Sequence, residues 1–163
     1  MPGKPEEREI PEETFLRKKL EIENQYKLTE PTNCPYLKNR VNFNASGLEH
    51  LKFKDTKERP RNKYEQYIRF KLFYLVPEIL RKSHTLQGYW ETKEWERQKR
   101  HGVWEKILID IKYYEFIAVI GKARIKVIIK KIEKEGSYIF WSVIPFWKMN
   151  KETSKRILHD EII

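Results

Sequence analysis

The spacing of apolar residues changes at about residue 86, and this change limits the possible folds more than any other feature of the sequence. Before it, apolar residues recur at helical spacing, most clearly over residues 63–82. After it come segments rich in Ile, Val, Tyr, Phe and Trp, separated by short polar gaps, at residues 86–97, 103–119, 124–132 and 138–146. This order predicts an α+β fold with N-terminal helices packed on a small antiparallel β-sheet of about four strands.

The N-terminal residues differ in character from the rest of the chain. Residues 1–10 combine proline, glycine and alternating charges, which is typical of a flexible tail. Pro11 suits the first turn of a helix, and the apolar stripe after it predicts an accessory helix to about Leu28. Two prolines in "TEPTNCPYLKN" indicate a linker. Residues 11–38 are thus expected to form the accessory helix and linker, and residues 39–163 the main α+β domain.

The start of the main domain predicts a strand and then two helices. "VNFN" alternates as a short strand, and "SGLEHLKF" follows as a helical turn or two with Ser46 available as its N-cap. Within the longer helix of residues 63–82, Pro77 predicts a kink or the start of a new helix.

Positive charge is concentrated outside the N-terminal segment. The chain has 34 Lys and Arg against 24 Asp and Glu, a net charge of +10. Residues 1–30 hold six basic and eight acidic side chains, so the remainder carries 28 basic and 16 acidic side chains, or +12. A body this basic favours a polyanion such as RNA as partner. An ordinary lysine-rich surface on a soluble protein explains the same charge.

Several classes of site are not expected. Cys34 is the only cysteine, which excludes an intramolecular disulfide and a cysteine-built metal site and favours a reducing cytoplasm. No apolar leader and no window of about 18 apolar residues is present, so neither secretion nor a membrane span is expected. No glycine-rich phosphate loop occurs, and the four histidines lack zinc spacing. No metal or other cofactor is therefore predicted.

His50 is the first candidate for proton transfer. On a helix through residues 47–54, His50 and Lys54 are four residues apart and share one face, away from Leu48 and Leu51. A neighbouring ammonium group would depress the pKa of His50 and keep its imidazole neutral, able to accept a proton. The alternative is a half-buried histidine that is hydrogen-bonded to the backbone.

The strand "ARIKVIIKKIE" predicts a row of cations on one sheet face. Arg124, Lys126 and Lys130 alternate with apolar residues that point to the other face. These cations would bind phosphate, and Ser142 on the next strand would add a hydrogen bond, although an ordinary solvated face has the same pattern. Exposed aromatic rings can stack on RNA bases, and the rings considered for this role are Trp90, Trp95 and Tyr114.

The order of segments from residue 41 to 147 resembles ribonuclease-like domains of phages, plasmids and toxin loci. These domains share the BECR fold of barnase, EndoU, the tRNA-cleaving colicins and RelE. The resemblance is in the order of "VNFNASGLEHLKFK", "RPRNKYEQYIRFKLFYLVPEIL", "DIKYYEF" and "RIKVIIKKIEKEGSYIFWSVIP". It implies metal-independent cleavage of RNA, in which the ribose 2′-OH attacks the adjacent phosphate and leaves a 2′,3′-cyclic phosphate. It also implies an antitoxin or immunity protein as a possible partner.

The resemblance assigns roles to particular residues. His50 would be the base or the acid, Tyr114 a second proton-transfer group, and Ser142 a hydrogen-bond donor to phosphate. The phosphate charge would be balanced by basic side chains. The resemblance gives this role to Arg61 or Arg69 and to Lys126, and the charge pattern of the chain adds Lys54, Arg124 and Lys130. No glutamate takes the place of a barnase-like base.

Two other functions remain open from the sequence. "LIDIK" places Asp110 and Lys112 at the acidic-x-Lys spacing of Mg²⁺-dependent restriction-type nucleases, although no second carboxylate is apparent. A non-catalytic module that binds RNA or protein explains the basic body as well. Cleavage of RNA with and without a chelator separates the three functions.

Overall fold

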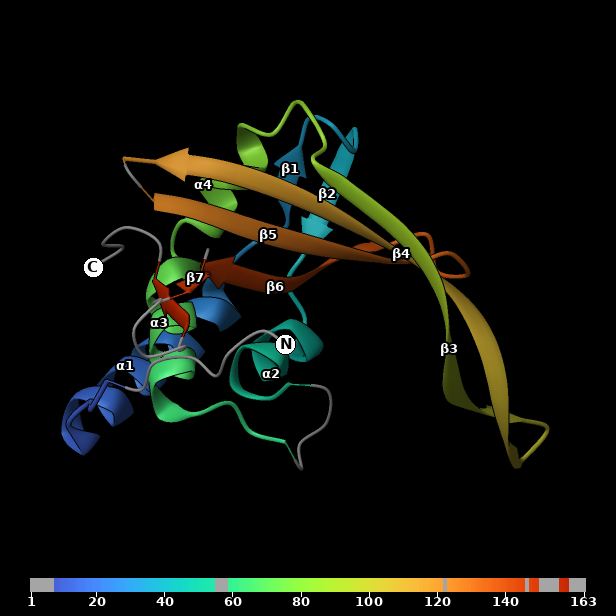
Figure 1. The fold of residues 1–163 in the computed structure, drawn as a ribbon. Helices are drawn as coiled ribbons and strands as arrows, with labels where there is room; N and C mark the ends of the chain where they lie inside the picture. The colour runs from blue at the N-terminus through green and yellow to red at the C-terminus, as the bar shows by residue number, and fades with distance from the viewer. Residues whose placement is uncertain (1–7, 55–58, 122, 146, 150–155, 159–163) are drawn as a thin grey trace.

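The computed structural model describes residues 8–54, 59–121, 123–145, 147–149 and 156–158. It is built around one six-stranded sheet with helices packed against one face, and a long β3–β4 hairpin extends past the helices (Figure 1). The helices are α1 (Glu12–Leu28), α2 (Ala45–Lys52), α3 (Lys63–Phe73) and α4 (Val76–Arg81). The strands are β1 (Thr32–Cys34), β2 (Asn39–Asn42), β3 (Gly88–Arg100), β4 (Val103–Ile120), β5 (Ala123–Ile132), β6 (Tyr138–Pro145), β7 (Trp147–Met149) and β8 (Arg156–Leu158).

The C-terminal half forms the antiparallel meander that the apolar pattern predicted. Strands β3 to β6 pair in sequence order, and each lies close to its predicted segment. The β3–β4 turn consists of His101 and Gly102, whose φ angles are 48° and 80°. Two consecutive residues with positive φ match the right-handed twist of the strands, which keeps this hairpin regular to its end.

The prediction of about four antiparallel strands is wrong, although the α+β class fits. The sheet is mixed and has six strands in the order β1-β2-β6-β5-β4-β3, and strands hold more residues than helices. Strand β2 pairs in parallel with the start of β6, and β1 pairs antiparallel with β2. The predicted strand "VNFN" overlaps β2 at Val41 and Asn42, whereas β1 lies in the predicted linker, because three residues are too few for alternation to distinguish a strand from a loop.

Helix α1 is part of the main hydrophobic core. It buries Phe15, Ile22 and Tyr26, and the Tyr26 ring lies 5.0 Å from Phe73 of α3 and 6.3 Å from Phe140 of β6. The Tyr26 hydroxyl donates a hydrogen bond of 2.6 Å to the carbonyl of Asn44. The helix of residues 11–28 and the main domain thus share one core.

Local signals explain where the other helices begin. Asn44, and not the predicted Ser46, is the N-cap of α2, because its side chain accepts a hydrogen bond from the Gly47 amide. The helical pattern over residues 63–82 is two helices, since α3 ends at Phe73 and α4 begins with Pro77 in its first turn. The prediction of a new helix at Pro77 is confirmed.

A β-bulge in β6 divides its side chains between the two faces of the sheet. Ile128 of β5 pairs with Ser142 and Ile129 pairs with Phe140, so Trp141 is the extra residue. Phe140 joins the main core beneath the helices. Trp141 packs instead with a second apolar cluster on the other face, which contains the side chains Ile109, Ile111, Tyr113 and Ile128.

Replacing Gly47 by alanine should destabilise the fold, because α2 lies directly against β6. A Cβ atom at Gly47 would come within 2.5 Å of the Phe140 carbonyl oxygen and would also meet the Tyr26 hydroxyl. Such overpacking costs about 1–3 kcal/mol, more than the roughly 1 kcal/mol that alanine gains over glycine in a helix. We expect Gly47→Ala to lower the free energy of unfolding in urea. Ser46→Ala, at an exposed position of the same helix, is the control. A Gly47→Ala protein as stable as the control would contradict this packing.

Candidate functional site

His50 lies near the end of α2, beside the bulge of β6. Its ring stacks on Trp141 with centroids 4.4 Å apart and planes 29° apart. Its Nδ1 atom is buried and makes no hydrogen bond with the described residues. A buried polar atom without a partner costs about 1–3 kcal/mol, which makes this nitrogen a place for a ligand or water.

The electrostatic surroundings keep the His50 imidazole neutral. Burial and the positive charges of Arg61, Arg69 and Lys130 lower its pKa from 6.5 to about 3. A hydrogen bond with the Trp141 backbone opposes this shift. The sequence attributed the lowered pKa of His50 to Lys54, whereas burial is the main cause and the cations come from α3, β5 and the loop before α3.

Lys54 is not the neighbour that the sequence indicated. Helix α2 ends at Lys52, and Phe53 is extended with φ −119° and ψ 153°. Residues 50 and 54 therefore do not share a helical face, because the chain leaves the helix to form a bridge between Phe53 and Pro60. Arg61 lies closer to the site, and its Nε atom donates a 3.1 Å hydrogen bond to the His50 carbonyl.

Arg69 and Ser142 contact each other at the edge of β6. The Arg69 guanidinium donates 2.9 Å hydrogen bonds to the Ser142 hydroxyl and to the Val143 carbonyl. Arg69 is 7% exposed and Ser142 is fully buried. These contacts give Arg69 a fixed position from which its charge acts on His50, while the buried Ser142 hydroxyl binds the arginine.

A second polar group lies on the uncovered face of the sheet. Lys130 places its ammonium 4.1 Å from the centre of the Trp141 ring and donates a 3.3 Å hydrogen bond to Glu94. The Tyr113 hydroxyl donates a 2.8 Å hydrogen bond to the other oxygen of the same carboxylate. Burial first, and then Glu94, raise the pKa of Tyr113, so its hydroxyl stays protonated.

Aromatic rings connect these groups in a row across the sheet. Tyr113 lies 6.4 Å from Trp141 and stacks on Trp90 with centroids 4.8 Å apart. Trp90 is on β3 and is 39% exposed. We call His50, Trp141, Lys130, Tyr113 and Glu94 the His50 cluster; Trp90 extends its row of rings to the edge strand.

Tyr114 points away from the cluster. It pairs with Ile129 of the main core and lies 5.2 Å from Tyr89 and 5.7 Å from Tyr138 on that side of the sheet. Burial first, and then Tyr138, raise its pKa to about 12. Because adjacent strand residues face opposite sides, the tyrosine on the side of Trp141 and His50 is Tyr113 and not Tyr114.

The predicted row of cations on β5 is real, but its members differ in surroundings. Arg124 is exposed, Lys126 pairs with Glu115 at 3.3 Å, and only Lys130 contacts the His50 cluster. Lys130 is 8% exposed. The row therefore contributes one cation to the site.

Asp110 and Lys112 lie on the other face of β4 from Tyr113. Asp110 is exposed and pairs with Lys93 at 3.7 Å. Lys112 pairs with Glu133 at 2.8 Å, and Glu133 is the main reason that the pKa of Lys112 rises to about 12. Among the described residues, no group of three or more His, Cys, Asp or Glu side chains is placed to hold a metal ion.

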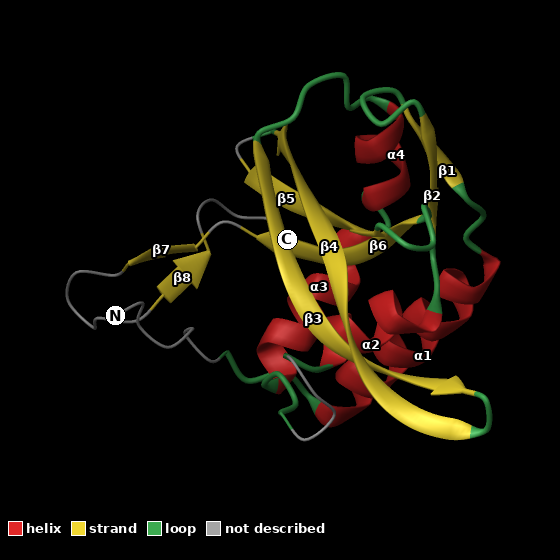
Figure 2. Cartoon of the chain, turned by 90° about the vertical axis from the view of Figure 1, so that its right-hand side faces the viewer, coloured by secondary structure: helices red, strands yellow, loops and turns green. Residues whose placement is uncertain are grey.

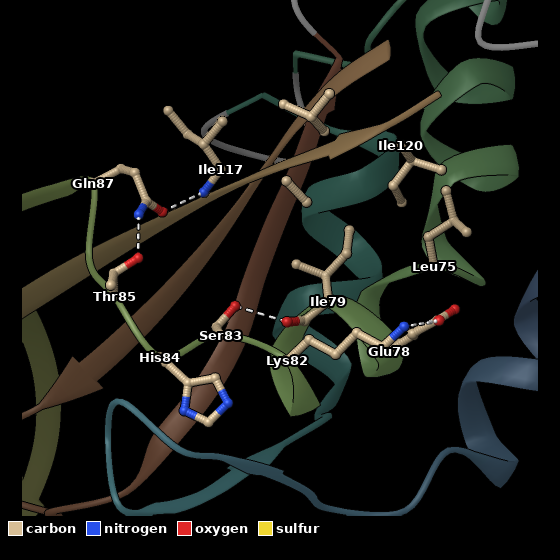
Figure 3. A pocket seen from close by; sticks show the side chains of 12 residues that line it. Leu75, Glu78, Ile79, Lys82, Ser83, His84, Thr85, Gln87, Ile117 and Ile120 are labelled. Carbon is tan, nitrogen blue, oxygen red and sulfur yellow. Dashed lines mark hydrogen bonds and ion pairs between the residues drawn. The ribbon is translucent and has the colours of Figure 1, made fainter. Parts of the chain in front are cut away.

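A pocket of about 420 Å³ lies between α4 and the end of β4 (Figure 3). Two pairs of its polar side chains bond within the pocket wall, Lys82 with Glu78 at 2.7 Å and the Gln87 amide with Thr85 at 2.9 Å, and the exposed His84 also lines it. None of the predicted site residues is among the described residues that line it. The pocket therefore has space but little available chemistry, and the His50 cluster is the better candidate site.

Sequence reasoning missed Trp141, Tyr113 and Glu94. Tyr113 is in the cluster because it pairs with Lys130 across β4 and β5, and this register depends on the turn between the two strands. Glu94 is one of several acidic residues on β3, and only its hydrogen bonds with Lys130 and Tyr113 distinguish it. One signal was usable: consecutive strand residues face opposite sides of a sheet, so only one of Tyr113 and Tyr114 can face the same side as Lys130.

Comparisons of the chain with models of protein families, with curated proteins and with solved structures found no match. In the part of the chain that the structure describes, none of the helices combines the length and the apolar character needed to cross a membrane. The function is therefore argued from the geometry of the site.

The lowered pKa of His50 predicts a specific loss of stability in acid. Between pH 6.5 and about 3 the unfolded chain protonates this imidazole and the folded protein does not, so the free energy of unfolding falls as the pH falls. The limit is about 1.4 kcal/mol per pH unit. We expect urea unfolding between pH 7 and pH 4.5 to show a larger loss, by about 1–2 kcal/mol, in the parent protein than in His50→Gln. Equal losses in the two proteins would show that His50 is protonated in the folded state.

Proposed function

We propose that this protein is a metal-independent endoribonuclease whose active site is the His50 cluster. The observation that carries the proposal is a buried imidazole nitrogen without a described partner, held neutral by burial and by three cations, beside a row of aromatic rings. Cleavage by internal attack needs a proton acceptor, positive charge at the phosphate and a surface for the bases. The cluster offers each of these.

In this proposal His50 is the general base. Its neutral imidazole accepts the proton of the ribose 2′-OH, the 2′-oxygen forms a bond to phosphorus, and the bond from phosphorus to the 5′-oxygen breaks. The hydrogen-bonded pair of Tyr113 and Glu94 supplies a proton to the leaving 5′-oxygen. The products are a 2′,3′-cyclic phosphate and a free 5′-hydroxyl.

The cations around His50 stabilise the charge on the phosphate. Lys130 lies over the Trp141 ring that stacks on His50, Arg61 bonds to the His50 carbonyl, and Arg69 is a positioning residue that acts through Ser142 and the edge of β6. The negative charge that develops on the phosphate in the transition state offsets the positive charges of Arg61, Arg69 and Lys130, which contribute to the low pKa of His50. Binding of substrate therefore raises the basicity of the group that must accept the proton.

The same proposal includes the biological setting that the sequence suggests. A toxin or phage-borne ribonuclease of this kind acts in the cytoplasm on RNA, and an antitoxin or immunity protein neutralises it. Cys34 is a buried free cysteine whose pKa is raised by burial, which suits a reducing compartment. The +12 charge of residues 31–163 supports an anionic partner of either kind.

A non-catalytic RNA-binding module is the second candidate, and one observation favours it. An imidazole with a pKa of about 3 is a weak base at neutral pH. If bound RNA leaves this pKa unchanged, the cluster binds RNA without cleaving it.

The proposal predicts cleavage of RNA in the presence of EDTA, with 2′,3′-cyclic phosphate ends. We expect His50→Gln to reduce the cleavage rate about 10²–10⁴-fold, the usual contribution of a general base. Tyr113→Phe should also reduce the rate, whereas Tyr114→Phe on the opposite face should retain it. His84→Ala is the control for an exposed histidine outside the cluster. Full cleavage by His50→Gln, or complete inhibition by EDTA, would contradict the proposal.

Binding of an uncleavable 2′-O-methyl RNA should raise the pKa of His50. The phosphate charge opposes the effect of Arg61, Arg69 and Lys130, so the imidazole takes up a proton when RNA binds and affinity increases as the pH falls. The measurement is an NMR titration of the His50 ring protons with and without the RNA. An unchanged pKa in the complex would favour the non-catalytic module.

A further inference from the structure

The end of the β3–β4 hairpin extends away from the rest of the protein. Figures 1 and 2 show it projecting beyond the helices from two directions. We call residues 93–110 the hairpin arm. Its strands are paired without interruption from Lys93 and Asp110 to the turn at His101 and Gly102. The arm is therefore a regular two-stranded ribbon.

The two faces of the hairpin arm carry opposite charges. Because Trp95 pairs with Leu108, Arg97 with Lys106, and Lys99 with Trp104, these six side chains lie on one face. We call it the cationic face; between Trp95 and the turn it has three basic side chains and no acidic one. The other face has the residues Glu94, Glu96, Gln98, Arg100, Val103, Glu105, Ile107 and Ile109.

Large apolar groups are exposed on the cationic face. Trp95 is 70% exposed, Trp104 is 60% exposed and Leu108 is 48% exposed. The Arg97 guanidinium lies 5.7 Å from the centre of the Trp104 ring. Isolated exposed apolar residues are common, but two exposed tryptophans interleaved with three cations on one ribbon face form a defined surface.

The chemistry of this face matches single-stranded nucleic acid. Exposed aromatic rings stack on unpaired bases, and cations between them bind the phosphates that link those bases. Lys93 pairs with Asp110 at the base of the arm, which ends the stretch of unbalanced positive charge there. The cationic face is thus long enough to bind a few nucleotides of a single strand, but too short to follow the groove of an extended duplex.

We propose that the cationic face of the hairpin arm binds single-stranded RNA next to the segment that occupies the His50 cluster. The choice of RNA rests on the proposed function. Glu94 of the cluster and Trp95 of the arm are consecutive residues on opposite faces of β3, and β3 is the last strand of the sheet. An RNA strand reaches from one surface to the other by passing around this edge.

Other occupants fit the surface less well. A second copy of the chain packed face to face would bring six cations together without an acidic partner, and like charges opposite one another are destabilising. An acidic protein matches the charge of this face. The exposed rings of Trp95 and Trp104, however, are better explained by stacking on bases. Binding of an acidic protein instead of RNA is an outcome of the test below.

The test uses the full chain and a fluorescent, single-stranded 2′-O-methyl RNA oligonucleotide, with binding followed by anisotropy. We expect Trp95→Ala and Trp104→Ala each to weaken binding about 10-fold, and RNA to quench tryptophan fluorescence in the parent protein. Arg97→Ala with Lys106→Ala should reduce the slope of log affinity against log salt by about 1.5. The matched control is Glu96→Gln with Glu105→Gln on the other face. All these side chains project from the ribbon, and circular dichroism checks that each variant is folded.

The outcomes separate this inference from the proposed function. Unchanged affinity in both tryptophan variants would overturn it, as would equal binding of duplex RNA, or competition by an acidic polypeptide alone. RNA binding that is weakened about 10-fold in each tryptophan variant supports it, even if no RNA is cleaved. Cleavage of a dinucleotide by the tryptophan variants at the parent rate would show that the His50 cluster acts independently of the arm.

Discussion

The bulge at Trp141 is the constraint on which the rest of the structure depends. It reverses the alternation of β6, so that Phe140 and Val143 lie in the main core while Trp141 and Ile144 pack with the cluster on the other face. Helix α2 fits against the Phe140 carbonyl only because residue 47 is glycine. The same few residues hold Arg69 through Ser142 and Val143. One extra residue therefore sets both the packing of the helices and the position of His50.

Electrostatics connects this packing to the proposed chemistry. Three cations from separate elements surround a partly buried imidazole, and each would be expensive to bring there without a compensating anion. Glu94 compensates Lys130 through a 3.3 Å contact, and the Trp141 ring offers its face to the same ammonium. These charges lie near the His50 Nδ1 atom, which makes no hydrogen bond with the residues that the structure describes.

The strand period organises the surface as well as the core. On β3, even-numbered residues give Trp90 and Glu94 to the side of the His50 cluster, and odd-numbered residues give Trp95 and Arg97 to the cationic face. A single edge strand therefore contributes to both proposed RNA contacts. No described helix packs on the end of the arm, so neither of its faces needs to be apolar there. Basic side chains can therefore gather on one face and acidic side chains on the other.

The sequence by itself determined the local elements. The meander of β3 to β6, the break at Pro77 and the alternation of cations on β5 all follow from the spacing of apolar residues, which short-range sterics and burial enforce. It also indicated His50 as a residue with a depressed pKa. It placed a short strand at "VNFN", which overlaps the end of β2, but it took β1 for part of a linker, since β1 is held only by pairing with β2.

Only the tertiary structure decided which side chains meet. The termination of α2 at Lys52 removed Lys54 from the face of His50, and the register of β4 against β5 selected Tyr113 over Tyr114. Helix ends and strand registers depend on small differences in free energy that distant contacts control, such as the bridge between Phe53 and Pro60. Residue types and periods are properties of a segment, whereas a site is a property of the way in which segments pack.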